Sequence, residues 1–159
     1  MNPIRIRDQR NNQWVSGSDF TPQGMRHRFS KEELEATQVR VHEQGDEATP
    51  QLFELAFEPG LEVAVHSHAA DEIFYVVAGS FEIGKRSLGP GSSVFVPADT
   101  LYSFRAGPEG LQVLNFRPRT DAVYRTPEEH KQWMRGKSKS RGLSPGSDVE
   151  AKPANPASD

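Results

Sequence analysis

Between residues 51 and 118, apolar residues recur in short runs, several of which alternate with polar residues. The runs are rich in β-branched and aromatic side chains and are bounded by Gly, Pro or Asp, which is typical of strands joined by tight turns. No helical period separates them, so we expect an antiparallel sandwich or a small barrel rather than a doubly wound α/β sheet. The pattern predicts six to eight short strands, over residues 51–57, 62–68, 72–79, 80–83, 86–88, 92–97, 101–106 and 111–118.

Helical signals flank this region on both sides. Ser30 and Glu33 have the spacing of a capping box, which predicts one or two helical turns ending near Gln38. Val39 and Val41 alternate with polar neighbours, so a strand is the other candidate there.

A second capping box, Thr126 with Glu129, predicts a helix after the strands, with Pro127 at its first position. We expect Gly136 to end this helix. Three of its side chains share one face and are expected to dock against the strands: His130, Trp133 and Met134.

These signals divide the chain into four parts. We expect an N-terminal arm over residues 1–45, a β-barrel over residues 46–120, a C-terminal helix over residues 121–136 and a tail over residues 137–159. The tail consists largely of Ser, Pro, Gly and charged residues, so it is expected to be disordered, and the N-terminal arm is expected to be flexible.

Composition narrows the function classes. The net charge of −3 gives no global basic field, so we expect no nucleic-acid partner. The 159 residues include no cysteine, which excludes disulfides, thiolate metal sites and a cysteine nucleophile. No stretch is apolar enough to span a bilayer, and the first residues lack a signal-peptide core. We therefore expect a cytoplasmic protein without a membrane partner.

The densest chemical signal lies in residues 60–79. His66 and His68 are two apart, so on a strand both imidazoles face the same way. Glu72 follows a short turn, and antiparallel pairing would bring it back beside them. Two imidazoles and one carboxylate form a ligand set that suits Fe(II) and also Mn, Ni, Co or Zn. The alternative is a hydrogen-bonded polar cluster without metal, because buried polar groups need partners.

This stretch resembles the first motif of the cupin superfamily, G-x5-H-x-H-x3-E-x6-G. All fixed positions match, namely Gly60, His66, His68, Glu72 and Gly79. The resemblance implies an all-β fold, a jelly-roll β-barrel with a metal in its mouth. It also implies that the two histidines and the glutamate are the metal ligands.

The second cupin motif, G-x5-P-x-G-x2-H-x3-N, matches only in part. Gly91 and Pro97 agree, whereas Asp99 replaces a glycine, Tyr102 the fourth ligand histidine and Ala106 an asparagine. Asp99 is a mild change, because Asp tolerates left-handed turn geometry better than most residues.

Tyr102 is the candidate catalytic residue. A phenol with a pKa near ~10 is normally neutral, but beside a divalent cation it could ionise and coordinate. Alternatively it stays a phenol and transfers a proton to or from a substrate. The third alternative is that Tyr102 fills space and hydrogen-bonds Glu72 in a site without metal.

Strand parity predicts the walls of a cavity. Phe53, Phe74 and Phe104 fall on the expected inward faces and are the candidate substrate-binding residues, with core packing as the alternative. Leu114 and Phe116 share a parity as well, whereas no Arg or Lys falls convincingly on an inward face. This favours a small, partly apolar organic molecule over a phosphorylated sugar.

Two functions follow from these features. The first is a metal-dependent cupin enzyme of the dioxygenase or lyase/isomerase type, with Fe(II) as the foremost metal and Mn, Ni or Zn as alternatives. The second is a non-catalytic barrel that binds or senses a small molecule, with or without metal. We expect a homodimer, in which Ile4 and Ile6 could form an arm on the partner.

Overall fold

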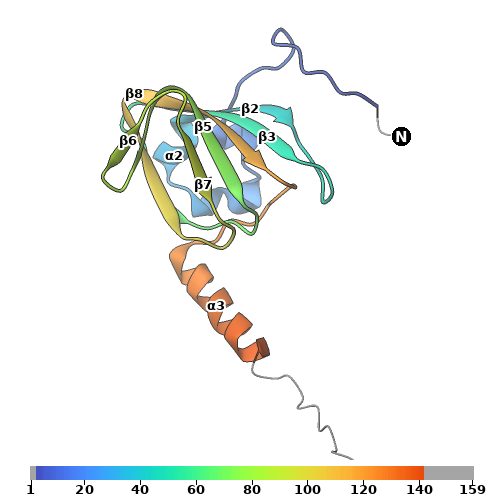
Figure 1. The fold of residues 1–159 in the computed structure, drawn as a ribbon, viewed down its shortest axis with the longest axis vertical. Coiled ribbons are helices and arrows are strands. Elements are labelled where there is room, and N and C mark those ends of the chain that lie inside the picture. Colours follow the sequence, from blue (N-terminus) through green and yellow to red (C-terminus); the bar gives the residue numbers. More distant parts are fainter. Residues whose placement is uncertain (1–2, 142–159) are drawn as a thin grey trace, which may run out of the picture.

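Antiparallel strands form the centre of the molecule, and one long helix projects from it (Figure 1). The computed structural model describes residues 3–141. Its strands are β1 (Val15–Ser16), β2 (Thr37–Glu43), β3 (Gln51–Phe57), β4 (Glu62–His66), β5 (Glu72–Ile83), β6 (Arg86–Leu88), β7 (Ser93–Val96) and β8 (Tyr102–Arg117). Its helices are α1 (Gly17–Phe20), the 3-10 helix η1 (Gln23–Arg28), α2 (Lys31–Glu35) and α3 (Pro127–Arg141).

All strand pairs are antiparallel, as the short runs and tight turns predicted. The main path of the sheet is β1-β2-β3-β8-β5-β6, while β4 pairs with β8 and β7 pairs with β5. The two halves of β8 pair with different strands, the first with β4 and the second with β3. The sheet therefore folds over on itself around β8, and the all-β class is confirmed.

Strands β5 and β8 are longer than predicted, because glycines bend them where we expected breaks. Residues 72–79 and 80–83 form one strand, and so do residues 101–106 and 111–118 with the turn-like residues between them. Gly79 has a φ of +70°, and a Cβ there would lie 2.0 Å from the carbonyl oxygen of Gly110. Glycine permits this close crossing of two backbones, so the strands bend without ending.

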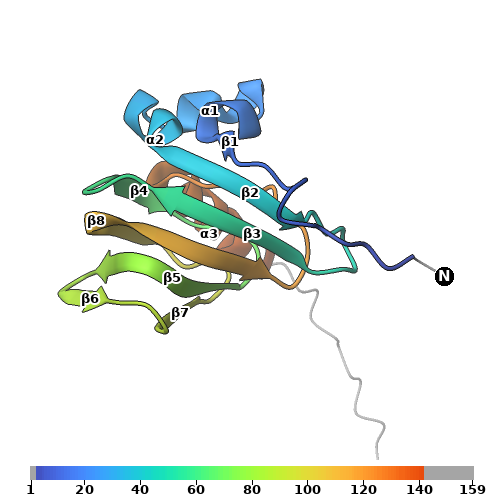
Figure 2. The same ribbon diagram turned by 90° about the horizontal axis from the view of Figure 1, so that it is seen from above.

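The segment before β3 is part of the folded body rather than a separate arm. β2 pairs with β3 along its length, and α1 and α2 pack beside β2 (Figure 2). The predicted capping box of Ser30 and Glu33 is present. Glu33 also accepts a 2.9 Å hydrogen bond from the backbone N–H of Ala64, which ties α2 to β4. The helix ends at Glu35, earlier than predicted, and β2 begins at Thr37. The strand alternative was therefore right for Val39 and Val41.

The start of the described chain remains outside this body. Ile4 and Ile6 are 93% and 83% exposed and belong to no strand. These two residues therefore pair with no strand of the described chain. Their contact with a partner stays a prediction.

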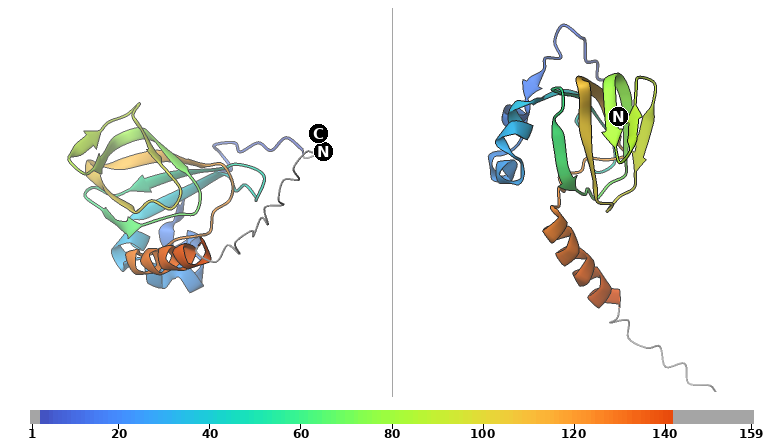
Figure 3. Two further views of the ribbon diagram at one scale, coloured as in Figure 1. Left: turned by 60° about the horizontal axis from the view of Figure 1, so that its bottom comes forward. Right: turned by 90° about the vertical axis from the view of Figure 1, so that its left-hand side faces the viewer.

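Helix α3 begins where its capping box predicted, but it runs through Gly136 to Arg141. An isolated glycine costs about 1 kcal/mol within a helix, and its neighbours Lys131, Gln132, Arg135 and Lys137 are good helix formers. The helix leaves the barrel at its first turns and points away from it (Figures 1 and 3). Among residues 3–141, no helix is long and apolar enough to cross a membrane.

The docking face predicted for α3 is only partly used. His130 Nδ1 lies 2.9 Å from the hydroxyl of Ser67, and Trp133 stacks under the guanidinium of Arg125. Met134 is 46% exposed and does not dock. The prediction of a disordered tail over residues 137–159 was wrong for residues 137–141, which are helical. Residues 142–159 lie outside the described part of the chain.

Candidate functional site

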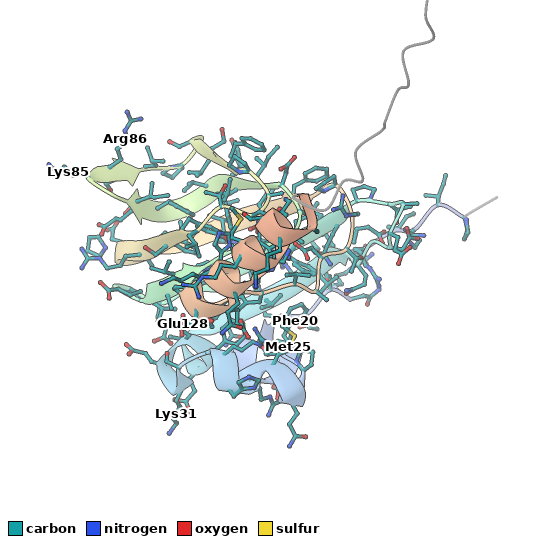
Figure 4. All side chains as sticks on the ribbon, turned by 90° about the horizontal axis from the view of Figure 1, so that it is seen from below. Phe20, Met25, Lys31, Lys85, Arg86 and Glu128 are labelled. Atoms are coloured by element: carbon teal, nitrogen blue, oxygen red, sulfur yellow. The ribbon has the colours of Figure 1, made fainter. Side chains whose placement is uncertain are left out.

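A cavity of about 460 Å³ opens inside the barrel. Its walls come from the inward faces of the strands, from the segment 17–34 and from the loop 118–126. The helical segment contributes Phe20 and Met25, which Figure 4 shows on the opposite side of the molecule from Lys85 and Arg86 at the β5–β6 hairpin. The predicted substrate-binding residues Phe53, Phe74 and Phe104 all line this cavity. Their part in substrate binding stays a prediction.

The two predicted histidine ligands lie at the polar end of the cavity, and the Nδ1 atom of each ring contacts a backbone carbonyl oxygen. His66 is the last residue of β4, and its Nδ1 lies 2.7 Å from the carbonyl oxygen of Ala64. His68 follows β4, and its Nδ1 lies 2.6 Å from the carbonyl oxygen of Val123. A carbonyl oxygen only accepts, so each Nδ1 carries the proton and each Nε2 keeps a lone pair. Metal-binding histidines commonly donate their other ring N–H to a carbonyl or carboxylate oxygen in this way.

Glu72 begins β5 and is 1% exposed. Its Oε2 accepts hydrogen bonds from Asn115 Nδ2 at 3.0 Å and from Arg117 Nη2 at 2.9 Å. Burial alone would raise the pKa of this carboxyl, but the Arg117 charge and the other partners outweigh it and hold the pKa below its usual value. Glu72 is thus ionised at neutral pH, with Oε2 anchored and Oε1 directed at the remaining polar groups.

Tyr102 starts β8 and lies between the imidazole and the carboxylate. Its hydroxyl oxygen is 3.0 Å from His66 Nε2 and 3.0 Å from Glu72 Oε1. Both of those atoms are acceptors, and a phenol has one proton to donate. One acceptor therefore always faces an oxygen lone pair. His68 Nε2, also a lone-pair donor, lies 3.7 Å from the same Glu72 oxygen.

This surplus of lone pairs is the observation that bears on a metal ion. Two atoms bound to one metal at about 2.1 Å stand roughly 3.0 to 3.4 Å apart, close to the spacings around Tyr102 and Glu72. Among residues 3–141, however, no three His, Cys, Asp or Glu side chains are gathered tightly enough to hold an ion. The Tyr102 hydroxyl instead connects His66 to Glu72. The donor set thus fits a metal by its chemistry and by its free lone pairs, although the side chains stand too far apart to hold an ion as they are arranged.

Burial sets the protonation of the other groups. It lowers the pKa of His66, and together with the Arg117 charge it lowers the pKa of His68 to about 4. Both imidazoles are therefore neutral at neutral pH, as metal ligands must be. Burial, followed by the charge of Glu72, raises the pKa of Tyr102 well above its usual value. Without a cation beside it, Tyr102 is a neutral phenol.

Two parity predictions on β8 were wrong. Phe53 and Phe74 both pair with Asn115, so Asn115 and Arg117 face the cavity while Leu114 and Phe116 face outward. A one-residue shift exchanges the two faces of a strand, and apolar residues occur on both parities over residues 111–116. Arg117 therefore contradicts the expectation that no Arg or Lys points inward.

Sequence reasoning also missed the loop between β8 and α3. Tyr124 is buried and stacks on His66 with ring centroids 4.6 Å apart. Asp121 accepts hydrogen bonds from the backbone N–H groups of Ala69 and Ala70, which fixes the turn between the histidines and Glu72. Tyr124 and Asp121 therefore help to close the site. They lie in residues 121–126, which the sequence analysis assigned to the C-terminal helix, and no motif identified them.

The motif glycines have a backbone role that supports the site. Gly60, Gly79 and Gly91 all have positive φ, a conformation that favours glycine. Asp99, in the position of a motif glycine, has φ +60° and is the one non-glycine residue of the described chain with positive φ. Its N–H donates a 2.7 Å hydrogen bond to the carbonyl oxygen of His68. The expectation that Asp99 tolerates left-handed geometry is confirmed.

Comparison with solved structures identifies proteins that share this fold. No protein-family model matches the chain, and no curated protein matches it. Solved structures do match. An RmlC-like cupin protein from Ralstonia eutropha is 18% identical with a TM-score of 0.58, over 88% of this chain and 90% of the other. The DMSP lyase DddQ from Ruegeria pomeroyi is 21% identical with a TM-score of 0.55, over 74% of this chain and 62% of the other. These likenesses show a shared fold.

Proposed function

We propose that this chain, which has the cupin fold, is an enzyme that acts on a small, partly apolar organic molecule with the help of a divalent metal. His66 Nε2, His68 Nε2 and Glu72 Oε1 would hold the metal, with Fe(II) foremost and Mn, Ni or Zn as alternatives. The observation that carries this proposal is the proton count: two lone-pair donors, His66 Nε2 and Glu72 Oε1, share the single proton of Tyr102, and a third, His68 Nε2, has only a weak contact from Arg117. A cation among them would interact favourably with every one of these lone pairs, which the single proton of Tyr102 cannot do.

The residues of the chain divide the remaining tasks. When bound, the metal supplies a Lewis acid and a template for the substrate. Phe53, Phe74 and Phe104 offer an apolar wall for the body of the substrate. Tyr102 would be the proton donor of the cluster, since its raised pKa keeps the phenol protonated at neutral pH. This division fits a lyase, an isomerase or a dioxygenase.

Metal analysis of the purified full chain, prepared without chelators, tests the proposal. We expect near-stoichiometric transition metal in the unsubstituted protein and loss of most of it in His66→Ala. His27→Ala is the matched control, since His27 is exposed on η1 and lines no part of the cavity. Metal-free protein, or equal metal in all three, would contradict the proposal.

Tyr102→Phe then assigns the role of the phenol. Retained metal with lost turnover of a panel of small carbonyl and phenolic compounds would identify a proton donor, whereas lost metal would identify a ligand. Comparing turnover with and without oxygen separates a dioxygenase from a lyase or isomerase.

A non-catalytic binding barrel is the second candidate. The hydrogen bonds among Tyr102, Glu72, Asn115 and Arg117 favour it, because they hold the cluster together without an ion. On this alternative, a ligand would bind the cavity equally well before and after metal removal, and no compound would be converted.

We also propose that the chain forms a homodimer through the outer face of its sheet. One row of paired residues crosses β3, β8, β5 and β7: Leu52, Phe116, Ile73 and Phe95. We call Ile73, Tyr75, Val77, Phe95 and Phe116, which are each 39% to 60% exposed, the outer apolar patch. The expected cytoplasmic location and the absence of nucleic-acid and membrane partners remain predictions.

The size of the outer apolar patch supports a second copy as its occupant. At roughly 200 Å² for an aromatic side chain, its three aromatic residues expose on the order of 300 Å². A standard interface buries about 800 Å² per partner, of which about 65% is apolar in homodimers. The patch therefore supplies more than half of the apolar area that such an interface needs.

A further inference from the structure

Arg117 is the one Arg or Lys that lines the cavity in the described part of the chain. It is the last residue of β8, and its side chain is 12% exposed. Its immediate neighbours are polar, because Arg117 pairs with Gln51 and contacts Glu72. The apolar part of the wall begins with Phe53 and Phe74, which both pair with Asn115, two residues earlier on β8. A guanidinium in such a cavity is a strong and specific recognition group for an anion.

The hydrogen bonds of Arg117 leave part of its guanidinium available. Nε and one N–H of Nη2 donate to Glu72 Oε2, and one N–H of Nη1 donates to the carbonyl oxygen of Asp121. The second N–H of Nη2 has only His68 Nε2, at 3.5 Å, which is a weak contact. The second N–H of Nη1 has no further acceptor among the described residues. Nη1 and Nη2 thus each keep one N–H for an oxygen pair, as a carboxylate provides.

The charges of the site point the same way. Glu72 and Arg117 form an ion pair that cancels, and the neutral imidazoles add nothing. A divalent metal on the proposed ligands would leave a charge of +2 at the end of a largely apolar cavity, which is costly unless an anion joins it. Metal binding would also occupy His68 Nε2 and remove the weak acceptor of Arg117.

We propose that the cavity takes a small organic acid with an apolar body, and that Arg117 holds its carboxylate beside the metal position. This inference deepens the proposed function and rests on it. The single cation and the apolar wall favour a carboxylate over a phosphate ester, which usually gathers several cationic or backbone N–H donors.

Calorimetric titration of the full chain with benzoate and with benzamide tests the inference, since the two probes share a ring but differ in charge. In the presence of Mn(II), we expect benzoate to bind at least about tenfold more tightly than benzamide. Arg117→Gln should abolish this preference. Arg105→Gln should keep it, because Arg105 is an exposed arginine that pairs with Glu82 outside the cavity. Inorganic phosphate is titrated as a third probe.

Equal binding of benzoate and benzamide by the unsubstituted protein, or an unchanged preference in Arg117→Gln, would overturn the inference, as would phosphate binding more tightly than benzoate. Arg117→Gln leaves Glu72 without its cation, so Arg117→Gln with Glu72→Gln, compared with Glu72→Gln alone, serves if the single variant does not fold. Binding of Mn(II) to the protein is measured separately. If Mn(II) does not bind but the benzoate preference holds and depends on Arg117, the metal proposal falls and the carboxylate site stands.

Discussion

Asp99 shows how one residue supports the site from outside it. Its positive φ costs a non-glycine residue about 1 to 3 kcal/mol, and its carboxylate forms an ion pair with Arg125 at 2.9 Å. Its N–H meanwhile holds the carbonyl oxygen of His68. The residue thus combines a turn that glycine would favour with a charge that glycine lacks.

Substitution of Asp99 separates these two contributions. Asp99→Val, with a β-branched side chain at positive φ, should lower the free energy of unfolding by about 2 kcal/mol. Asp99→Gly removes the strain together with the Arg125 ion pair, so its loss should be smaller. Urea denaturation of both variants measures the difference. Equal destabilisation would show that the ion pair, rather than the backbone conformation, dominates.

At the scale of elements, a charged cluster on the outer face of the sheet joins three strands. Glu54 of β3 is 5% exposed and accepts hydrogen bonds from Arg40 of β2 and Gln112 of β8, while His42 Nε2 lies 2.9 Å away. Burial would raise the pKa of Glu54, but these partners outweigh it and hold the pKa below its usual value near 4.5. The ionised carboxylate therefore favours the folded state.

The pH dependence of stability follows from this direction. A carboxyl whose pKa is lower in the folded state contributes stability that is complete above the unfolded pKa and is lost as the pH falls through the folded one. We expect the free energy of unfolding to fall more steeply below about pH 4.5 in the unsubstituted protein than in Glu54→Gln. Denaturant titrations between about pH 3 and 7 measure both slopes. Parallel curves would contradict this role of Glu54.

The strands, the capping boxes and the glycine turns were predictable because each depends on a local pattern. Period-2 alternation marked β3 and the start of β5, and the motif glycines marked positions of positive φ. His66, His68 and Glu72 line one cavity, as predicted, but the expected pairing of their two strands was wrong, because β4 pairs with β8 and not with β5.

The inward position of Arg117 was not predictable in the same way. Residues 111–117 carry apolar side chains on both parities, and only the pairing of β8 with β3 and β5 decides which face is buried. Tyr124 and Asp121 depend on where a loop folds back in space, which no local pattern encodes. The parts of the site missed from the sequence are therefore those fixed by tertiary contacts.

At the scale of the whole molecule, the segment before the barrel has a second use. Phe20 packs edge-on against Phe53 with ring centroids 5.3 Å apart, and Phe29 packs against Tyr124. Arg28 donates hydrogen bonds to the carbonyl oxygen of Tyr124 and to Glu129 at the start of α3. Residues 17–34 lie beside the barrel strands (Figure 3). They contribute Phe20, Met25 and Phe29 to the cavity lining, so the shape of the cavity depends on this segment as well as on the barrel.

The outer apolar patch predicts the assembly of the molecule. Phe95 is its most exposed member at 60%, and it pairs with Ile73 in the row that crosses four strands. Placing a charge there should weaken self-association by about 30-fold or more, because a buried aromatic anchor is lost and a carboxylate would have to be desolvated. Light scattering coupled to size exclusion should report a dimer for the unsubstituted chain and a monomer for Phe95→Glu. Met134→Glu is the control, since Met134 is exposed on α3 away from the patch. A monomeric unsubstituted chain, or dimers that persist in Phe95→Glu, would remove this face as the interface.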